Sequence, residues 1–113
     1  MGMLENLEAM LAAGQDNALL RFTLGSEHLK QGEAQLAANH LREAVRQDPE
    51  YSAAWKIFGK ALQALNDYNG ACHAFEQGIE TAERKGDIQA AREMRVFLKR
   101  AHKAADEDCG NPS

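Results

Sequence analysis

The sequence resembles itself at a shift of 34 residues, which is the distance from Leu24 to Phe58. At this shift large apolar residues align with large ones and small residues with small ones. The aligned pairs are Leu24 with Phe58, Gly25 with Gly59, Ala37 with Ala71, Leu41 with Phe75, Ala44 with Gly78 and Val45 with Ile79. Self-similarity at a period of this length is typical of chains that stack small structural units side by side. We therefore predict two stacked units, at residues 18–51 and 52–85.

Each unit is predicted to be a helical hairpin. In the first unit, Leu20, Leu24 and Leu29 follow a helical spacing until Gly32, and glycine is the usual residue just past a helix end. The second helix of that unit should stop before Asp48-Pro49, because a residue that precedes proline avoids helical angles.

The second unit repeats this plan. Ser52 is predicted to be the N-cap of its first helix, and Asn66-Asp67 supplies the turn between its two helices. Glu83 stands where the first unit has its closing proline, so the second helix is expected to run on to about Lys85.

These residues resemble the tetratricopeptide-repeat family, in its small bacterial form with two repeats and a C-terminal capping helix. The second unit carries Trp55, Phe58-Gly59, Leu62, Ala71 and Phe75 at the family's spacing of Trp, Leu-Gly, Tyr, Ala and Phe. The first unit departs from the pattern, with Arg21 at the Trp position and His28 at the Tyr position. The resemblance implies an all-α fold, a right-handed superhelical stack of antiparallel hairpins with a concave inner face.

Two shorter segments flank the repeats. Residues 1–16 are predicted to form a short amphipathic helix, which could cap the stack, fill the protein's own groove or mediate self-association. Residues 86–107 are predicted to form the capping helix that a repeat stack needs at its end. We expect one domain over residues 1–107, about five helices besides the N-terminal one, and a disordered tail at 108–113.

Charge and hydropathy exclude several classes of function. The net charge is −4, which does not favour binding to nucleic acid. No apolar run is long enough to span a membrane, and the acidic N-terminus is unlike a secretion signal. We therefore expect a cytoplasmic protein that neither binds nucleic acid nor inserts into membranes.

Neither catalysis nor a bound cofactor or metal is expected. Two cysteines and four histidines show no zinc-ligand spacing. Cys72-His73 is the one suggestive pair, yet adjacent helical residues point about 100° apart and cannot meet as nucleophile and base. The chain is therefore predicted not to be an enzyme.

The family resemblance implies that the first helix of each hairpin lines a groove that receives a partner peptide or helix. The matching residues are Leu19, Phe22, Ser26, Leu29, Lys56, Lys60 and Gln63, with Met94 and Phe97 added by the last helix. Apolar side chains beside Lys56 and Lys60 favour a protein or peptide of mixed apolar and acidic character. The carboxylate clamp of some co-chaperones of this family is not expected, because Phe22 and Ser26 occupy its Lys and Asn positions in the first unit.

The last helix offers a possible second surface. Residues 84–103 carry seven basic and two acidic side chains, and Arg92, Arg95, Lys99 and Lys103 form the candidate basic surface. An adaptor or assembly factor is the predicted function. The alternative is a structural homo-oligomer joined through the N-terminal or the C-terminal helix, although a monomer is favoured.

Overall fold

The computed structural model describes residues 2–109, and every regular element in them is an α-helix, which confirms the predicted all-α class. The helices are α1 (Met3–Ala12), α2 (Ala18–Lys30), α3 (Ala34–Gln47), α4 (Ser52–Ala64), α5 (Tyr68–Arg84) and α6 (Ile88–Cys109). Helix α6 continues two residues past the expected boundary at 107, and residues 110–113 of the expected tail lie outside the described residues. No helix among the described residues is both long and apolar enough to cross a membrane.

Three helices begin at a side chain that caps the free N–H groups of the first turn. The side chains of Asn17, Asp67 and Asp87 accept backbone hydrogen bonds of 2.9, 3.0 and 3.1 Å at the starts of α2, α5 and α6. Ser52 does not act as the predicted cap of α4. It is the first helical residue, and Tyr51 occupies the capping position without a side-chain hydrogen bond.

Both hairpins turn at the same place. Gly32 and Asn66 stand 34 residues apart, and both adopt positive φ angles, 78° and 63°. Glycine reaches this left-handed region freely, and asparagine is one of the few other residues that tolerate it. Helix α3 ends at Gln47, as the Asp48-Pro49 pair predicted.

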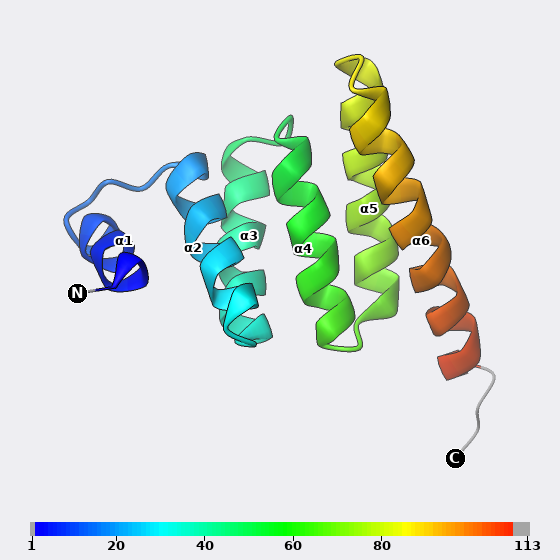
Figure 1. Cartoon of the computed structure of the whole chain (residues 1–113), viewed down its shortest axis with the longest axis horizontal. Helices are drawn as coiled ribbons and strands as arrows, with labels where there is room; N and C mark the ends of the chain where they lie inside the picture. Colours follow the sequence, from blue (N-terminus) through cyan, green and yellow to red (C-terminus); the bar gives the residue numbers. More distant parts are fainter. Residues whose placement is uncertain (1, 110–113) are drawn as a thin grey trace.

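The helices form two layers (Figure 1). Helices α2, α4 and α6 make one layer, in which α2 contacts α4 and α4 contacts α6. Helices α3 and α5 make the other layer and do not contact each other within the described residues. Because the helices of the first layer lie closer together, the stack curves towards it, and α2, α4 and α6 line the concave face.

One close contact recurs at the same place in both hairpins. A Cβ atom on Gly25 would lie 2.5 Å from Leu41, and one on Gly59 would lie 2.5 Å from Phe75. Leu41 and Phe75 are both fully buried. Glycine lets the two helices of a hairpin approach until the large side chain of one lies on the backbone of the other. The sequence similarity at a shift of 34 residues therefore reflects a packing contact that both hairpins make.

Candidate partner-binding groove

A hollow of about 460 Å³ lies between α2 and α4. It is lined by Phe22, Ser26, Leu29, Lys30, Ile57 and Lys60. Since α2 and α4 belong to the concave layer, the hollow opens on the inner face of the stack. Four of the nine residues predicted for the groove line it, namely Phe22, Ser26, Leu29 and Lys60.

The floor of the hollow is apolar. Phe22, Leu29 and Ile57 are half-buried and pack against the core of the protein. The ring of Phe22 lies 4.9 Å from that of Tyr51, measured between centroids, so the residue before α4 packs on the floor residue Phe22. A concave apolar surface that the fold itself leaves partly open is a favourable place for a partner's side chains.

Ser26 contributes an unsatisfied polar atom. Its Oγ is buried and has no hydrogen-bond partner among the described residues. Burying a hydroxyl without a partner costs about 1–3 kcal/mol. A ligand group that hydrogen-bonds to Ser26 would recover part of that cost.

The lysines around the hollow differ in how they are held. Lys60 Nζ lies 4.5 Å from the centroid of the Phe97 ring, a cation–π arrangement. Lys30 is exposed and forms a 3.2 Å ion pair with the half-buried Glu27, one helical turn earlier. Because Lys30 and Lys60 both line the hollow, either side chain could meet a carboxylate of a partner bound there.

Lys56 does not belong to this pair of lysines. Its Nζ lies 3.3 Å from a carboxylate oxygen of Glu93 on α6, and the residue does not line the hollow. The sequence predicts both Lys56 and Lys60 for the groove, but Lys60 alone lines the hollow, and each lysine has a contact within the fold. The four-residue spacing cannot show this, because Glu93 comes from a helix whose register departs from the repeat.

The other predicted groove residues are dispersed. Met94 is 1% exposed and lies over Gly78, so it is a core residue and the prediction for it is wrong. Phe97 packs on Phe75 with ring centroids 5.7 Å apart and does not line the hollow, although Lys60 lies over its ring. Gln63 is half-buried on α4 but does not line the hollow, and Leu19, 65% exposed, borders a smaller hollow between α1 and α2.

Ile57 lines the hollow although the sequence did not single it out. It stands three residues before Lys60, so the helical spacing could have identified it. The repeat pattern does not reveal it, because Ile57 falls between the family's signature positions.

Helix α1 leaves the groove open. It contacts α2 alone among the described helices, at the end of the stack away from α4 (Figure 1). A carboxylate oxygen of Glu8 lies 3.6 Å from Nε2 of the buried His28, which ties α1 to the repeats.

The linker after α1 is held by Asp16, which accepts hydrogen bonds from Arg21 and Gln47. The Arg21 guanidinium keeps the pKa of Asp16 well below its usual range.

The residues of the candidate basic surface are all exposed on α6. Arg95 forms a 2.5 Å ion pair with Glu83 of α5. For Arg92, Lys99 and Lys103 the structure records no ion pair within the described residues.

The fold brings Cys72 to a histidine that the sequence did not suggest. Its sulfur lies 3.6 Å from Nδ1 of His102 on α6, whereas the neighbouring His73 points towards Trp55. Burial raises the pKa of the Cys72 thiol, with the carboxylate of Glu76 adding to the effect. The thiol is therefore neutral at physiological pH and poorly nucleophilic.

This protonation state has a measurable consequence. In a Cys109→Ser background, Cys72 should react with iodoacetamide at neutral pH more slowly than a free cysteine does. Unfolding in urea should abolish the protection. Fast alkylation of the folded protein would contradict the assignment of Cys72 as an inert core thiol.

Comparison with known proteins identifies relatives both in sequence and in structure. No family model matches the chain. It is 56% identical over 102 residues to a TPR repeat-containing protein of Pseudomonas aeruginosa, and the match covers 90% of this chain and 97% of that protein. It is also 35% identical over 82 residues to a heat-shock protein cognate co-chaperone of Aspergillus fumigatus, covering 73% of this chain but 24% of that protein. Among solved structures, a Bordetella parapertussis protein superposes with a TM-score of 0.79 at 43% identity, over 98% of this chain and 96% of that one.

Proposed function

This chain belongs to the tetratricopeptide-repeat family, whose domains bind protein partners, and from that premise we propose that it is a non-catalytic adaptor or assembly factor. It binds a segment of a partner protein in the hollow between α2 and α4. The segment is apolar on the side that enters the hollow and acidic on the side that meets Lys30 and Lys60.

The observation that carries this proposal is the combination of three features in one hollow. Its floor is apolar, two lysines line it, and the buried hydroxyl of Ser26 lacks a hydrogen-bond partner among the described residues. An apolar floor alone would accept many peptides. The lysines favour acidic ones, because like charges on the ligand would be repelled at close range.

The co-chaperone relative raises the question of a chaperone-tail ligand. A carboxylate clamp would need basic or amide side chains on three successive inner helices. Here Phe22 occupies the first of these positions, and Met94, which would have to serve on α6, is buried. We therefore propose a partner held by apolar contact with acidic flanks, rather than by a clamped terminal carboxylate.

A double charge reversal tests the groove. Lys30→Glu combined with Lys60→Glu places two carboxylates in the lining of the hollow and should weaken capture of an acidic partner by about tenfold or more. The assay is a pull-down from lysate of the cell that makes the protein, followed by affinity measurement with the captured partner. Neither residue is buried, and circular dichroism checks that the variant keeps its helices.

The matched control carries the same change in net charge elsewhere. Lys99→Glu combined with Lys103→Glu alters α6, which does not line the hollow. We expect the control to capture the partner as the wild type does. If both variants lose the partner equally, binding depends on overall charge; if only the control loses it, the site lies on α6. Either outcome would refute the groove assignment.

A further inference from the structure

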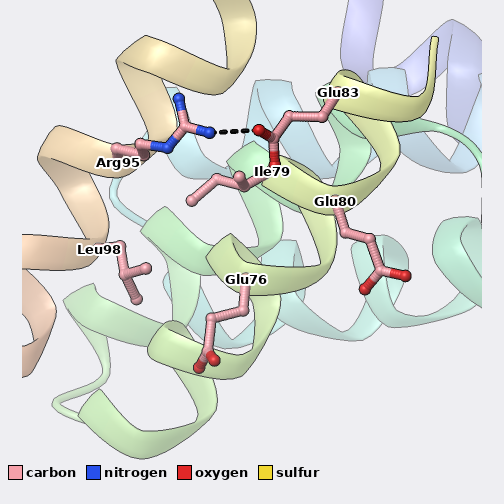
Figure 2. A pocket seen from close by; sticks show the side chains of 6 residues that line it. All are labelled: Glu76, Ile79, Glu80, Glu83, Arg95 and Leu98. Atoms are coloured by element: carbon pink, nitrogen blue, oxygen red, sulfur yellow. Dashed lines mark hydrogen bonds and ion pairs between the residues drawn. The ribbon is translucent and has the colours of Figure 1, made fainter.

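A second hollow, of about 320 Å³, lies between α5 and α6, and its lining differs in every residue from that of the partner-binding groove. Ile79 and Leu98 form its apolar part. Glu83 of α5 and Arg95 of α6 form an ion pair across it, with Oε2 and Nη2 2.5 Å apart. Figure 2 marks this pair with a dashed line. The carboxylates of Glu76 and Glu80 extend from α5 without reaching Arg95 (Figure 2).

The two helices beside this hollow carry opposite charges on their exposed surfaces, and Arg95 is the basic side chain that lines the hollow itself. We call Glu76, Glu80 and Glu83 the acidic row of α5, and Arg92, Arg95, Lys99 and Lys103 the basic row of α6. Both rows are exposed and follow helical spacing along their helices. Among the described residues, the pair between Arg95 and Glu83 is the single ion pair that joins the rows, while Glu80 pairs with Arg84 of its own helix. Glu76, Lys99 and Lys103 make no ion pair within the described residues.

The stack of helices is also incomplete beside this hollow, because α6, the last helix that the structure describes, lacks a hairpin partner. Helix α2 is covered by α3, and α4 by α5, but within the described residues no later helix packs on α6. The apolar side chains Ile88 and Val96 of α6 remain exposed. In a longer repeat stack the second helix of the next hairpin would pack on α6, as α3 packs on α2 and α5 packs on α4.

We propose that this face binds a second copy of the chain, so that two α5–α6 hairpins related by a two-fold axis form a dimer. A two-fold interface is made by the same surface on both subunits, and it must therefore be complementary to itself. A face with an acidic row beside a basic row meets this condition. Each copy's basic row lies against the acidic row of its partner, and Leu98 and Ile79 are covered at the centre.

The charge rows predict how the dimer responds to salt. The rows are exposed, and screening at physiological ionic strength acts over about 8 Å, so added salt should weaken the association. The apolar hollow is small, so the dimer should dissociate on dilution. These properties distinguish it from a large obligate interface, which is mainly apolar.

Complementary charge reversals test the proposal. One variant carries Glu76→Lys and Glu80→Lys, and the other carries Lys99→Glu and Lys103→Glu. Each variant alone opposes like charges across the two-fold axis, so its dimer should be weaker by about tenfold or more. Mixed in equal amounts, the two variants present opposite rows to each other, and the mixture should dimerise as the wild type does. Sedimentation velocity over a concentration series, at low and high salt, measures the wild type, each variant and the mixture.

Several results would overturn the dimer. The wild type should reach two copies and no more, so monomer at every concentration, or growth beyond a dimer on concentration, would refute it. A mixture that stays monomeric would refute the pairing of the rows. If circular dichroism shows that the lysine substitutions on α5 disturb folding, Glu76→Gln with Glu80→Gln replaces them and should weaken the dimer less.

The Lys30→Glu, Lys60→Glu groove variant should dimerise as the wild type does. The test of the dimer is therefore independent of the test of the proposed function.

Discussion

Replacing Phe75 by alanine is expected to lower the free energy of unfolding by about 3–5 kcal/mol, the range for truncating a large buried aromatic side chain. Phe75 is 0% exposed and is the largest fully buried side chain described. Its ring lies on Gly59 of α4 and against Phe97 of α6, so it joins three helices. A domain of ordinary stability has about 5–15 kcal/mol in total, and the variant should therefore be close to unfolding.

Urea unfolding followed by circular dichroism measures this loss. The melting temperature should fall by on the order of 10–20 °C. Ile88→Ala is the control, because Ile88 is 64% exposed and its truncation should change stability by less than about 0.5 kcal/mol. Equal losses in the two variants would mean that Phe75 is not at the centre of the core.

Replacing Gly59 by valine should destabilise the protein by about 1–3 kcal/mol, through overpacking. In an ordinary helix, exchanging glycine for a residue with a side chain stabilises by about a few tenths of a kcal/mol or more. Here the new Cβ would lie 2.5 Å from the Phe75 ring, so the sign of the effect reverses. A decrease in the free energy of unfolding, rather than an increase, would therefore show that α4 and α5 pack in close contact at Gly59.

A double-mutant cycle identifies the cause. Phe75→Leu removes the ring that the valine would strike, so the double variant should lose less stability than the two single variants lose together. Contacting residues typically couple by about 0.5–3 kcal/mol in such cycles. Additive losses would show that Gly59 and Phe75 do not restrict each other.

The hairpins could be predicted from the sequence because their constraints are local or repeated. Gly32 and Asn66 end the first helix of each hairpin at equivalent places, and Asp48-Pro49 ends α3. The contacts of Gly25 with Leu41 and of Gly59 with Phe75 recur at the 34-residue shift, so both pairs align in the sequence itself.

The groove could be predicted only in part, because α6 does not continue the repeat. Its register decides that Met94 is buried over Gly78 and that Glu93 reaches Lys56. Neither contact follows from the spacing of residues within one helix. The α2 residues Phe22, Ser26 and Leu29 do line the hollow, because α2 keeps the family's register.

Photo-crosslinking in the living cell tests the groove most directly. A photoreactive phenylalanine analogue is placed at Lys30, an exposed position that lines the hollow, and in separate samples at Glu80 and at Val96, on the far helices. We predict that the analogue at Lys30 crosslinks a partner protein and that the other two positions do not crosslink that partner. Crosslinks to the partner from Glu80 or Val96, with none from Lys30, would contradict a binding site in the groove.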